Sequence, residues 1–352
     1  MFSSPLPELI NLLSENQELN GNQIAESIDA LTNPDVQESE KLEFLTAMTE
    51  KGETELEFSH FVREFRKRAI SPELDEFSTR AIDLCGTGGD QAGSFNISTF
   101  VSFLVASAGI PVIKHGNRSI SSKCGSADLL EAVGIPLAPA KEKLQEGLKC
   151  LNFGFLFAPQ YHPAFKHIAP VRKRLAEQGI LTFFNVMGPM LNPARPSYQL
   201  VGSFDPNYLR PMAKALETNN LKSGLIAHCQ VEDDEITCVD ELTACGENLV
   251  FGFGRNQTKE VEKWSPSEWN QKEYPIRHLK GGDLSENLKI MKNILDGDCF
   301  PGLTATILVN AATAFLICER VESLGEGVEL AESLIQDGKV KKWLDLTSDF
   351  FA

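Results

Sequence analysis

The sequence predicts an α/β protein in which a small helical domain precedes a larger α/β domain with a mostly parallel central sheet. Apolar residues recur at helical spacing as far as about Ile70, and short apolar runs alternate with helical patterns after Ser71-Pro72. Those short runs are apolar on both faces, which suits strands of a parallel sheet covered by helices on each side. The chain has 352 residues, of which 42% are hydrophobic and 23% charged, so it is long enough to bury a full core.

The amino-terminal region is predicted to form three or four short helices. Turn-forming pairs interrupt its apolar pattern at Asn20-Gly21, Asn33-Pro34 and Lys51-Gly52. We expect residues 1–72, joined by part of 163–182, to form the helical domain, and residues 78–352 to form the α/β domain that binds donor and acceptor. A unit of about seventy residues has little core of its own. We therefore expect it to pack on the rest of the chain and to form a homodimer.

Six apolar runs of the larger domain are predicted to be strands, namely residues 81–85, 112–114, 154–158, 182–186, 200–204 and 225–228. A polar stretch over residues 256–273 is typical of a surface excursion. Helical patterns over residues 303–318 and 328–344 close the chain.

The composition argues against several classes of protein. The formal net charge of −16 opposes attraction to nucleic acid or to an anionic membrane. No run of about 18 apolar residues occurs, and the start of the chain lacks the pattern of a secretory signal, so we expect a cytoplasmic protein. The eight cysteines are scattered without a C-x-x-C pair, which favours buried, reduced thiols.

The first candidate site is a glycine-rich loop after the first predicted strand, with the sequence Asp83-Leu84-Cys85-Gly86-Thr87-Gly88-Gly89-Asp90. Glycines take positive φ readily and let backbone N–H groups point at a phosphate. The polar cluster Asn96-Ile97-Ser98-Thr99 then begins an apolar helix, whose N-terminus favours an anion. A tight turn followed by an ordinary N-cap explains the same residues equally well.

The second candidate site is a basic loop after the next strand, with the sequence Ile113-Lys114-His115-Gly116-Asn117-Arg118-Ser119-Ile120-Ser121-Ser122-Lys123-Cys124-Gly125-Ser126-Ala127-Asp128. It gathers three cations and four serines in an acidic protein. Cations neutralise a phosphate and hydroxyls adapt their direction to a ribose, so this loop suits both groups. A solvated surface loop is the less favoured alternative.

Together the two loops resemble those of the anthranilate phosphoribosyltransferases, whose pattern combines GTGGD, N-x-S-T and K-H-G-N-R-x-x-S-S-x-x-G-S-A-D in this order. The likeness extends through residues 51–54, 158–164, 169–172 and 184–193, and so covers nearly the whole chain. It implies a fold of the nucleoside phosphorylase and phosphoribosyltransferase kind. It also implies a magnesium-assisted transfer of the phosphoribosyl group of 5-phosphoribosyl diphosphate to the amine of anthranilate, in tryptophan biosynthesis.

The resemblance further implies which residues bind the substrates. The donor would be bound by Gly86, Gly89, Asp90, Ser94, Asn96, Ser98, Thr99, Lys114, His115, Gly116, Asn117, Arg118, Ser121, Ser122 and Ser126. Anthranilate would be bound by Gly86, Asn117 and Arg172, with the planar fork of Arg172 on its carboxylate. Without the resemblance, the run Arg172-Lys173-Arg174 favours an ordinary surface arginine.

The resemblance implies that magnesium would be held by Ser98, Asp234 and Glu235, and the acidic run of residues 232–235 by itself offers hard oxygen ligands of the kind that magnesium accepts. An acidic surface turn is the usual alternative. Magnesium and N–H donors can supply most of the catalysis, so no protein nucleophile is expected. We assign His115 a positioning role rather than that of a base, since an aromatic amine is already neutral at pH 7.

Two other functions compete with this interpretation. A pyrimidine nucleoside phosphorylase-like enzyme would share the architecture but lack the paired carboxylates and the K-H-G-N-R loop. A nucleic-acid-binding relative could keep the fold without the chemistry, although the acidic composition opposes it. The chain also departs from the family pattern, because Cys124 stands where serine is common, residues 175–181 form a slightly longer segment, and residues 243–280 match poorly.

Overall fold

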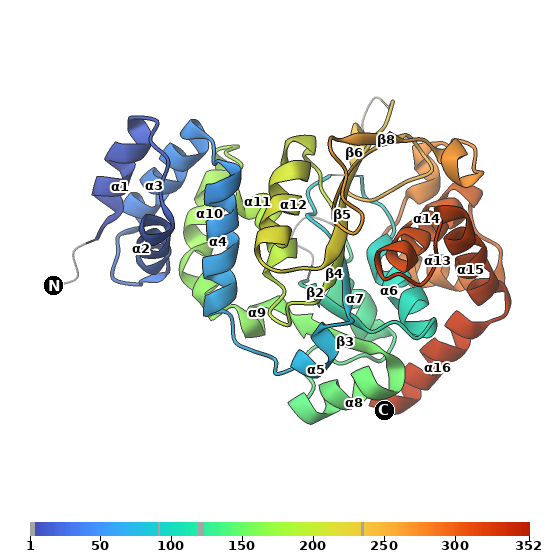
Figure 1. Ribbon diagram of the computed structural model, residues 1–352. Helices are drawn as coiled ribbons and strands as arrows, with labels where there is room; N and C mark the ends of the chain where they lie inside the picture. Colours follow the sequence, from blue (N-terminus) through green and yellow to red (C-terminus); the bar gives the residue numbers. More distant parts are fainter. Residues whose placement is uncertain (1–3, 91, 119–122, 234–235) are drawn as a thin grey trace.

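The computed structural model describes residues 4–90, 92–118, 123–233 and 236–352 (Figure 1). Four helices come first: α1 (Leu6–Ser14), α2 (Gly21–Thr32), α3 (Glu38–Lys51) and α4 (Glu55–Arg68). Asn20 caps α2 by accepting hydrogen bonds from two backbone N–H groups of its first turn, and Gly52 ends α3 at a positive φ of 79°. The predicted breaks at these two residues are therefore confirmed, because their local chemistry is that of helix ends.

The central sheet combines a parallel part with an antiparallel edge. Its parallel strands are β1 (Ile82–Gly86), β2 (Val112–Gly116), β3 (Phe153–Phe157), β4 (Tyr198–Gly202) and β5 (Ser223–Gln230). The antiparallel strands are β6 (Cys238–Val239), β7 (Glu247–Gly254) and β8 (Glu262–Trp264). The order is β3-β2-β1-β4-β5-β7-β8, with β6 paired to β5. The prediction of a mostly parallel sheet is confirmed.

The strand order reverses direction at β1, and in open α/β sheets such a reversal marks a ligand-binding crevice at the carboxyl ends of the strands. From β1 the chain proceeds outward to β2 and β3, and then returns to place β4 on the other side of β1. Loops that leave the carboxyl ends of β1 and β4 therefore diverge, which is where open α/β sheets bind their ligands.

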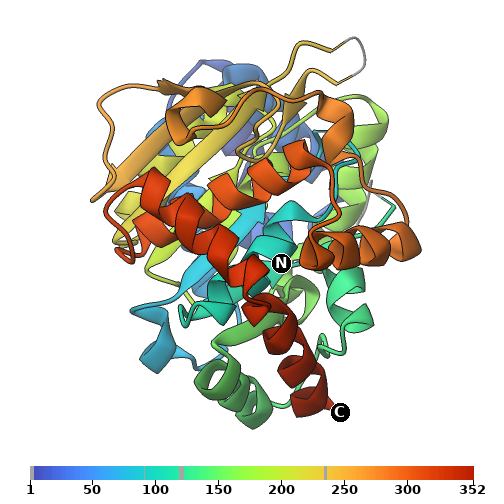
Figure 2. The same ribbon diagram turned by 90° about the vertical axis from the view of Figure 1, so that its right-hand side faces the viewer.

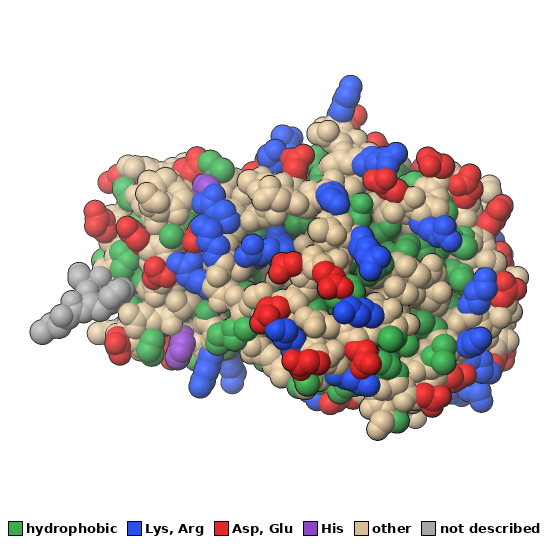
Figure 3. Space-filling model, turned by 60° about the horizontal axis from the view of Figure 1, so that its bottom comes forward, with side chains coloured by type: hydrophobic (Ala, Val, Ile, Leu, Met, Phe, Trp, Pro, Cys, Tyr) green, Lys and Arg blue, Asp and Glu red, His purple; other side chains and the backbone are tan. Residues whose placement is uncertain are grey.

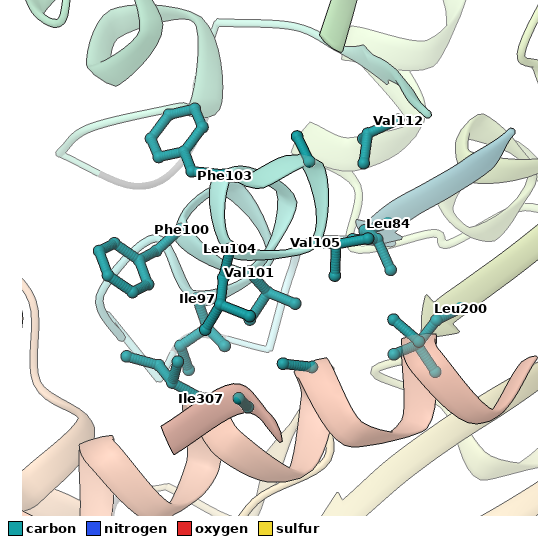
Figure 4. Close-up of a cluster of buried hydrophobic side chains, with 14 of the residues drawn as sticks. Leu84, Ile97, Phe100, Val101, Phe103, Leu104, Val105, Val112, Leu200 and Ile307 are labelled. Atoms are coloured by element: carbon teal, nitrogen blue, oxygen red, sulfur yellow. The ribbon is translucent and has the colours of Figure 1, made fainter. Parts of the chain in front are cut away.

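Neighbouring residues of the central strands enter different layers of the core, because side chains alternate across a strand. Leu84, Leu200 and Leu225 join one buried cluster, and the next residue of each strand, Cys85, Val201 or Ile226, joins another. The first layer contains α6 (Ile97–Ser107), α14 (Pro301–Ile317), α15 (Leu324–Gln336) and α16 (Lys339–Phe351) (Figure 2). Figure 4 shows side chains of α6 packed between the strands and α14.

The second layer joins the sheet to the amino-terminal helices. Its buried cluster contains residues of α1–α4, α10 (Ala169–Glu177), α11 (Phe184–Met187) and α12 (Leu209–Thr218), together with strand residues of β4, β5 and β7. Since the helices and the sheet share one apolar cluster, the division into residues 1–72 with part of 163–182 and residues 78–352 stays a prediction. The remaining helices are α5 (Asp75–Ser78), α7 (Ser126–Ala132), α8 (Lys141–Leu151), α9 (Ala158–Tyr161) and α13 (Leu284–Asp296).

Two expectations about secondary structure were wrong. Residues 182–186 are not a strand: the backbone N–H of Thr182 donates to the Asn185 side chain, and Phe184 begins the short helix α11. Their apolar character comes from aromatic packing, since Phe183 stacks on Phe61 with ring centroids 4.3 Å apart. The predicted helix over 328–344 is two helices, separated at Gly338, whose φ is 68°.

Two further properties concern the thiols and the helices. The eight cysteines, all within the described ranges, form no disulfide; Cys150 is exposed, and the other seven are buried or half-buried.

Among the described residues, no single helix has both the length and the apolar composition to cross a membrane. Only α13 and α14 taken together, across a 79° bend, pass that test.

Candidate functional site

The glycine-rich loop lies at the crevice between β1 and β4. Gly86 at the end of β1 is in register with Gly202 at the end of β4. The backbone N–H of Thr87 donates to the Gly202 carbonyl at 3.0 Å, and the Thr87 hydroxyl accepts from the Phe204 N–H at 3.0 Å. Gly88 and Gly89 have φ values of 71° and 88°, which favour glycine. The loop thus follows a strand, as the sequence predicted.

Lys114 is buried beneath this loop. Its side chain leaves β2 and donates hydrogen bonds to the Leu84 carbonyl and, at 3.3 Å, to the Ser98 hydroxyl at the start of α6. Burial lowers the pKa of Lys114, and the negative charge of Asp83 opposes that shift. A buried ammonium held against the first turn of a helix is well placed to attract an anion.

Asp83 fixes β2 from inside the sheet. Its carboxylate accepts from the His115 backbone N–H at 3.3 Å and from the Asn192 side chain at 2.8 Å. Burial raises the pKa of Asp83 to about 6, while Lys114 opposes the shift. The Asp83 carboxylate therefore fixes the backbone of His115, at the start of the basic loop.

The structure adds two residues that sequence reasoning missed, Asp240 and Glu241, which follow β6. The Asp240 carboxylate accepts from the Gly88 N–H at 2.6 Å, and its backbone N–H donates to Asp90 at 3.3 Å. Glu241 lies beside Ser98, whose backbone N–H and hydroxyl lower the pKa of the Glu241 carboxyl. A Cβ on Gly86 would lie 2.4 Å from the Asp240 carboxylate, so a side chain is excluded there.

Asp240 and Glu241 form a group of three carboxylates with Asp90. Burial raises the pKa of Asp240 well above its usual range, and the charges of Asp90 and Glu241 raise it further. Burial also raises the pKa of Glu241 to about 7, although Lys114 opposes the shift. The sequence did contain a signal for them, because an Asp-Glu pair occurs twice between residues 231 and 243, at Asp234-Glu235 and again at 240–241.

The basic loop contacts the start of α6. The Asn96 side chain donates to the Cys124 carbonyl at 3.2 Å, and the Ser126 hydroxyl donates to the Asn117 carbonyl at 3.2 Å. Arg118 is exposed, and its guanidinium is ion-paired at 2.7 Å with both Asp128 and Glu131 of α7. Four predicted site residues lie outside the described residues, namely Ser121, Ser122, Asp234 and Glu235.

Of the other predicted donor residues, Thr99 is fully buried and its hydroxyl has no hydrogen-bond partner. Ser94 is half-buried and pairs its backbone with that of Lys280. A Cβ on Gly116 would lie 2.8 Å from the Ser126 hydroxyl, so Gly116 allows close approach of the loop.

Arg172 differs from the surface arginine that its sequence run favours. Lys173 and Arg174 on the same helix are exposed, whereas the Arg172 side chain is half-buried. Its guanidinium lies 5.4 Å from the centre of the Phe184 ring and donates one long bond, 3.4 Å, to the Phe184 carbonyl. Burial lowers its pKa. Within the described ranges, no carboxylate lies at ion-pair distance from this guanidinium, so it can accept an external anion.

A series of ring contacts connects the basic loop to Arg172. The His115 and His162 rings are 5.1 Å apart, His162 contacts Phe165 at 5.8 Å, and Phe165 contacts Phe184 at 5.8 Å. Burial lowers the pKa of His115 to about 3 and that of His162 to about 4, and neither Nε2 atom has a hydrogen-bond partner. Both rings are thus neutral at pH 7, and with Phe165 and Phe184 they form a continuous row of aromatic contacts that ends beside Arg172.

Pre-formed metal sites are absent from the described part of the chain, where no three His, Cys, Asp or Glu side chains converge on a common ion position. Magnesium does not need such a cage, because it usually takes one or two carboxylates and keeps waters and substrate phosphates as its other ligands.

Comparison with known proteins gives consistent matches. Residues 78–341 match the family model described as the glycosyl transferase family, a/b domain. An anthranilate phosphoribosyltransferase of Solibacter usitatus is 38% identical over 351 residues, covering 99% of each chain. The crystal structure of the anthranilate phosphoribosyltransferase of Thermus thermophilus is 34% identical, with a TM-score of 0.85 over 97% of this chain and 98% of that one. The Saccharomyces cerevisiae enzyme in complex with PRPP and Mg, at 21% identity, shares the fold with a TM-score of 0.82 over 99% and 98% of the two chains.

Proposed function

The chain belongs to the anthranilate phosphoribosyltransferases of the glycosyl transferase family, and we propose that it catalyses the reaction of that family. It transfers the phosphoribosyl group of 5-phosphoribosyl diphosphate to the amine of anthranilate, giving N-(5-phosphoribosyl)anthranilate and diphosphate, in tryptophan biosynthesis. The observation that carries this proposal is the meeting of the glycine-rich loop, the buried Lys114 and the start of α6 at the crevice between β1 and β4.

The donor's diphosphate is assigned to this crevice. N–H groups of the glycine-rich loop and the first turn of α6 would hold the phosphate oxygens, and Lys114 would neutralise part of their charge. These groups stabilise diphosphate as it departs, because their donors are already oriented before the reaction. The basic loop, from His115 to Ser126 and with Ser121 and Ser122 included, is proposed to complete the donor site around the ribose.

The residues present also fit a divalent cation. Asp90, Asp240 and Glu241 form a group of three carboxylates, of which Glu241 interacts with the buried ammonium of Lys114, and burial together with the charge of Asp90 raises the pKa values of Asp240 and Glu241. We propose that Ser98, Asp240 and Glu241 hold magnesium together with donor oxygens. The bound ion would neutralise charge that develops on the leaving diphosphate.

The competing metal set, Ser98 with Asp234 and Glu235, stays a prediction, and one experiment separates the two. The variant Asp240→Asn/Glu241→Gln should need a much higher magnesium concentration for half-maximal activity than the wild type. The matched variant Asp234→Asn/Glu235→Gln should titrate with magnesium like the wild type. The reverse pattern would assign the metal to the earlier pair.

Anthranilate is assigned to the space beyond the basic loop, between Asn117, Gly86 and Arg172. The guanidinium of Arg172 would bind its carboxylate through a planar fork. The neutral rings of His115 and His162 would position its aromatic ring and exclude water rather than remove a proton. The neutral amine then attacks without a protein base.

Product analysis tests the whole assignment against its nearest rival. Incubation with 5-phosphoribosyl diphosphate, magnesium and anthranilate should yield N-(5-phosphoribosyl)anthranilate. Incubation with inorganic phosphate and a pyrimidine nucleoside should yield no ribose phosphate. The opposite outcome would favour a pyrimidine nucleoside phosphorylase-like enzyme. On the face shown in Figure 3, charges of both signs are interspersed, which does not favour a nucleic-acid-binding surface.

We further propose a cytoplasmic homodimer. The apolar stripes of α1–α4 are buried against α10–α12 within the chain, and the large hydrophobic side chains of residues 4–72 that stay exposed for a second subunit are Leu56 and Ile70.

A further inference from the structure

A short segment, Leu279–Gly282, pairs with residues 93–95, which follow the glycine-rich loop. We call this segment the strap. The Phe95 N–H donates to the Leu279 carbonyl at 2.8 Å, and the Gly281 N–H donates to the Gly93 carbonyl at 2.9 Å. Between these two bonds Ser94 and Lys280 form an isolated antiparallel bridge. The strap is thus attached by backbone bonds, and its first half belongs to the region that matches the family pattern poorly.

The bridge determines where the Lys280 side chain lies. In an antiparallel pair flanked by hydrogen bonds of this kind, the two opposed residues project their side chains from the same side, about 4.5–5.5 Å apart at Cβ. Ser94 belongs to the residues assigned to the donor. A cation that projects beside Ser94 therefore lies on the side where the donor's diphosphate would bind.

Lys280 is exposed, and within the described ranges no Asp or Glu lies at ion-pair distance from its ammonium. Two other cations of the site are already engaged. Arg118 is paired with two carboxylates, and Lys114 is buried among opposing charges. Lys280 is therefore a cation at this crevice whose charge is available to an incoming anion.

Gly281 makes this placement possible. A Cβ on Gly281 would lie 2.6 Å from the Ser94 carbonyl oxygen and 2.8 Å from the Phe95 nitrogen, both of them backbone atoms that cannot move aside. Gly325 on α15 provides a contrast, because a Cβ there would meet only the Ser323 hydroxyl, at an ordinary contact distance of 3.9 Å. Any side chain at residue 281 would thus push the strap away from Ser94.

We propose that Lys280 is a donor-binding residue that contacts the diphosphate of 5-phosphoribosyl diphosphate, and that Gly281 positions it by allowing the strap to bridge Ser94. This inference rests on the proposed function, since it takes the donor to lie in the crevice. Because Lys280 is exposed, its contact with the diphosphate should weaken as added salt screens the two charges.

The test is calorimetric titration of the full-length protein with 5-phosphoribosyl diphosphate and magnesium, at low and high ionic strength. Lys280→Gln should raise the donor Kd by about three- to tenfold at low salt, and by less at high salt, with an unchanged Tm. Lys292→Gln, an exposed lysine on α13, should leave the Kd unchanged.

Two glycine variants examine the position of the strap. Gly281→Ala should raise the donor Kd at least as much as Lys280→Gln and leave the anthranilate KM unchanged, whereas Gly325→Ala, at an uncrowded glycine of α15, should behave like the wild type. Equal donor Kd values for Lys280→Gln and Lys292→Gln would overturn the inference while the proposed function stands. A wild-type protein that binds no donor at all would overturn both.

Discussion

Replacing Arg172 by alanine should weaken anthranilate binding without changing donor binding. The guanidinium is half-buried, donates one long hydrogen bond to the Phe184 carbonyl, and has no carboxylate partner among the described residues. Removing one member of a buried, hydrogen-bonded charge pair costs roughly 2–5 kcal/mol. Because Arg172 is only half-buried, we take the lower end, about 2 kcal/mol, which corresponds to a loss of about thirty-fold.

The assay is steady-state kinetics with anthranilate varied at saturating donor, combined with calorimetric titration of the donor. Arg172→Lys keeps the charge but loses the fork, so it should recover only part of the loss. Lys173→Ala, an exposed neighbour on α10, is the matched control and should behave like the wild type. An equal loss for donor and acceptor in Arg172→Ala would refute the reasoning, because it would indicate a collapsed site rather than a lost carboxylate contact.

The remaining predictions concern pH, assembly and thiol chemistry. Burial lowers the pKa of His162 to about 4, while the unfolded chain takes up the proton near the ordinary value of 6.5; the free energy of unfolding should therefore fall as pH drops from 6.5 towards 4, by up to about 1.4 kcal/mol per pH unit for this histidine. Denaturant titrations of His162→Asn should show a smaller fall, and a slope equal to that of the wild type would contradict the buried neutral ring. Sedimentation at micromolar concentration should give twice the chain mass, and a clean monomer would remove the dimer through residues 1–72. A thiol reagent should modify Cys150 first because it is the exposed cysteine, and Cys150→Ser should abolish that fast phase.

Local patterns predicted the elements whose causes are local. The run that became β1 is followed by glycines whose positive φ values form the loop, and the helix breaks at Asn20 and Gly52 carry their own capping chemistry. The helix α13 also had a local signal, the capping box of Asp283 and Glu286, which the sequence prediction did not use. These elements could be placed from the sequence because each is determined within a few residues.

Contacts between distant segments could not be predicted in the same way. Residues 182–186 resemble a strand because the run is largely apolar. The Phe183 ring, however, stacks on Phe61, which lies more than a hundred residues earlier in the chain. The placement of Asp240 against Gly88 depends on β5 and β6 bringing that turn back to the crevice. Nothing in the spacing of one acidic pair distinguishes it from another until the sheet order is known.

The most direct test of the central claim is the release of diphosphate from 5-phosphoribosyl diphosphate in the presence of magnesium, measured with and without anthranilate. We predict rapid release that requires anthranilate and saturates with its concentration, and almost none when anthranilate is omitted. Release at the same rate in its absence, or none in its presence, would contradict the assignment of this chain as an anthranilate phosphoribosyltransferase.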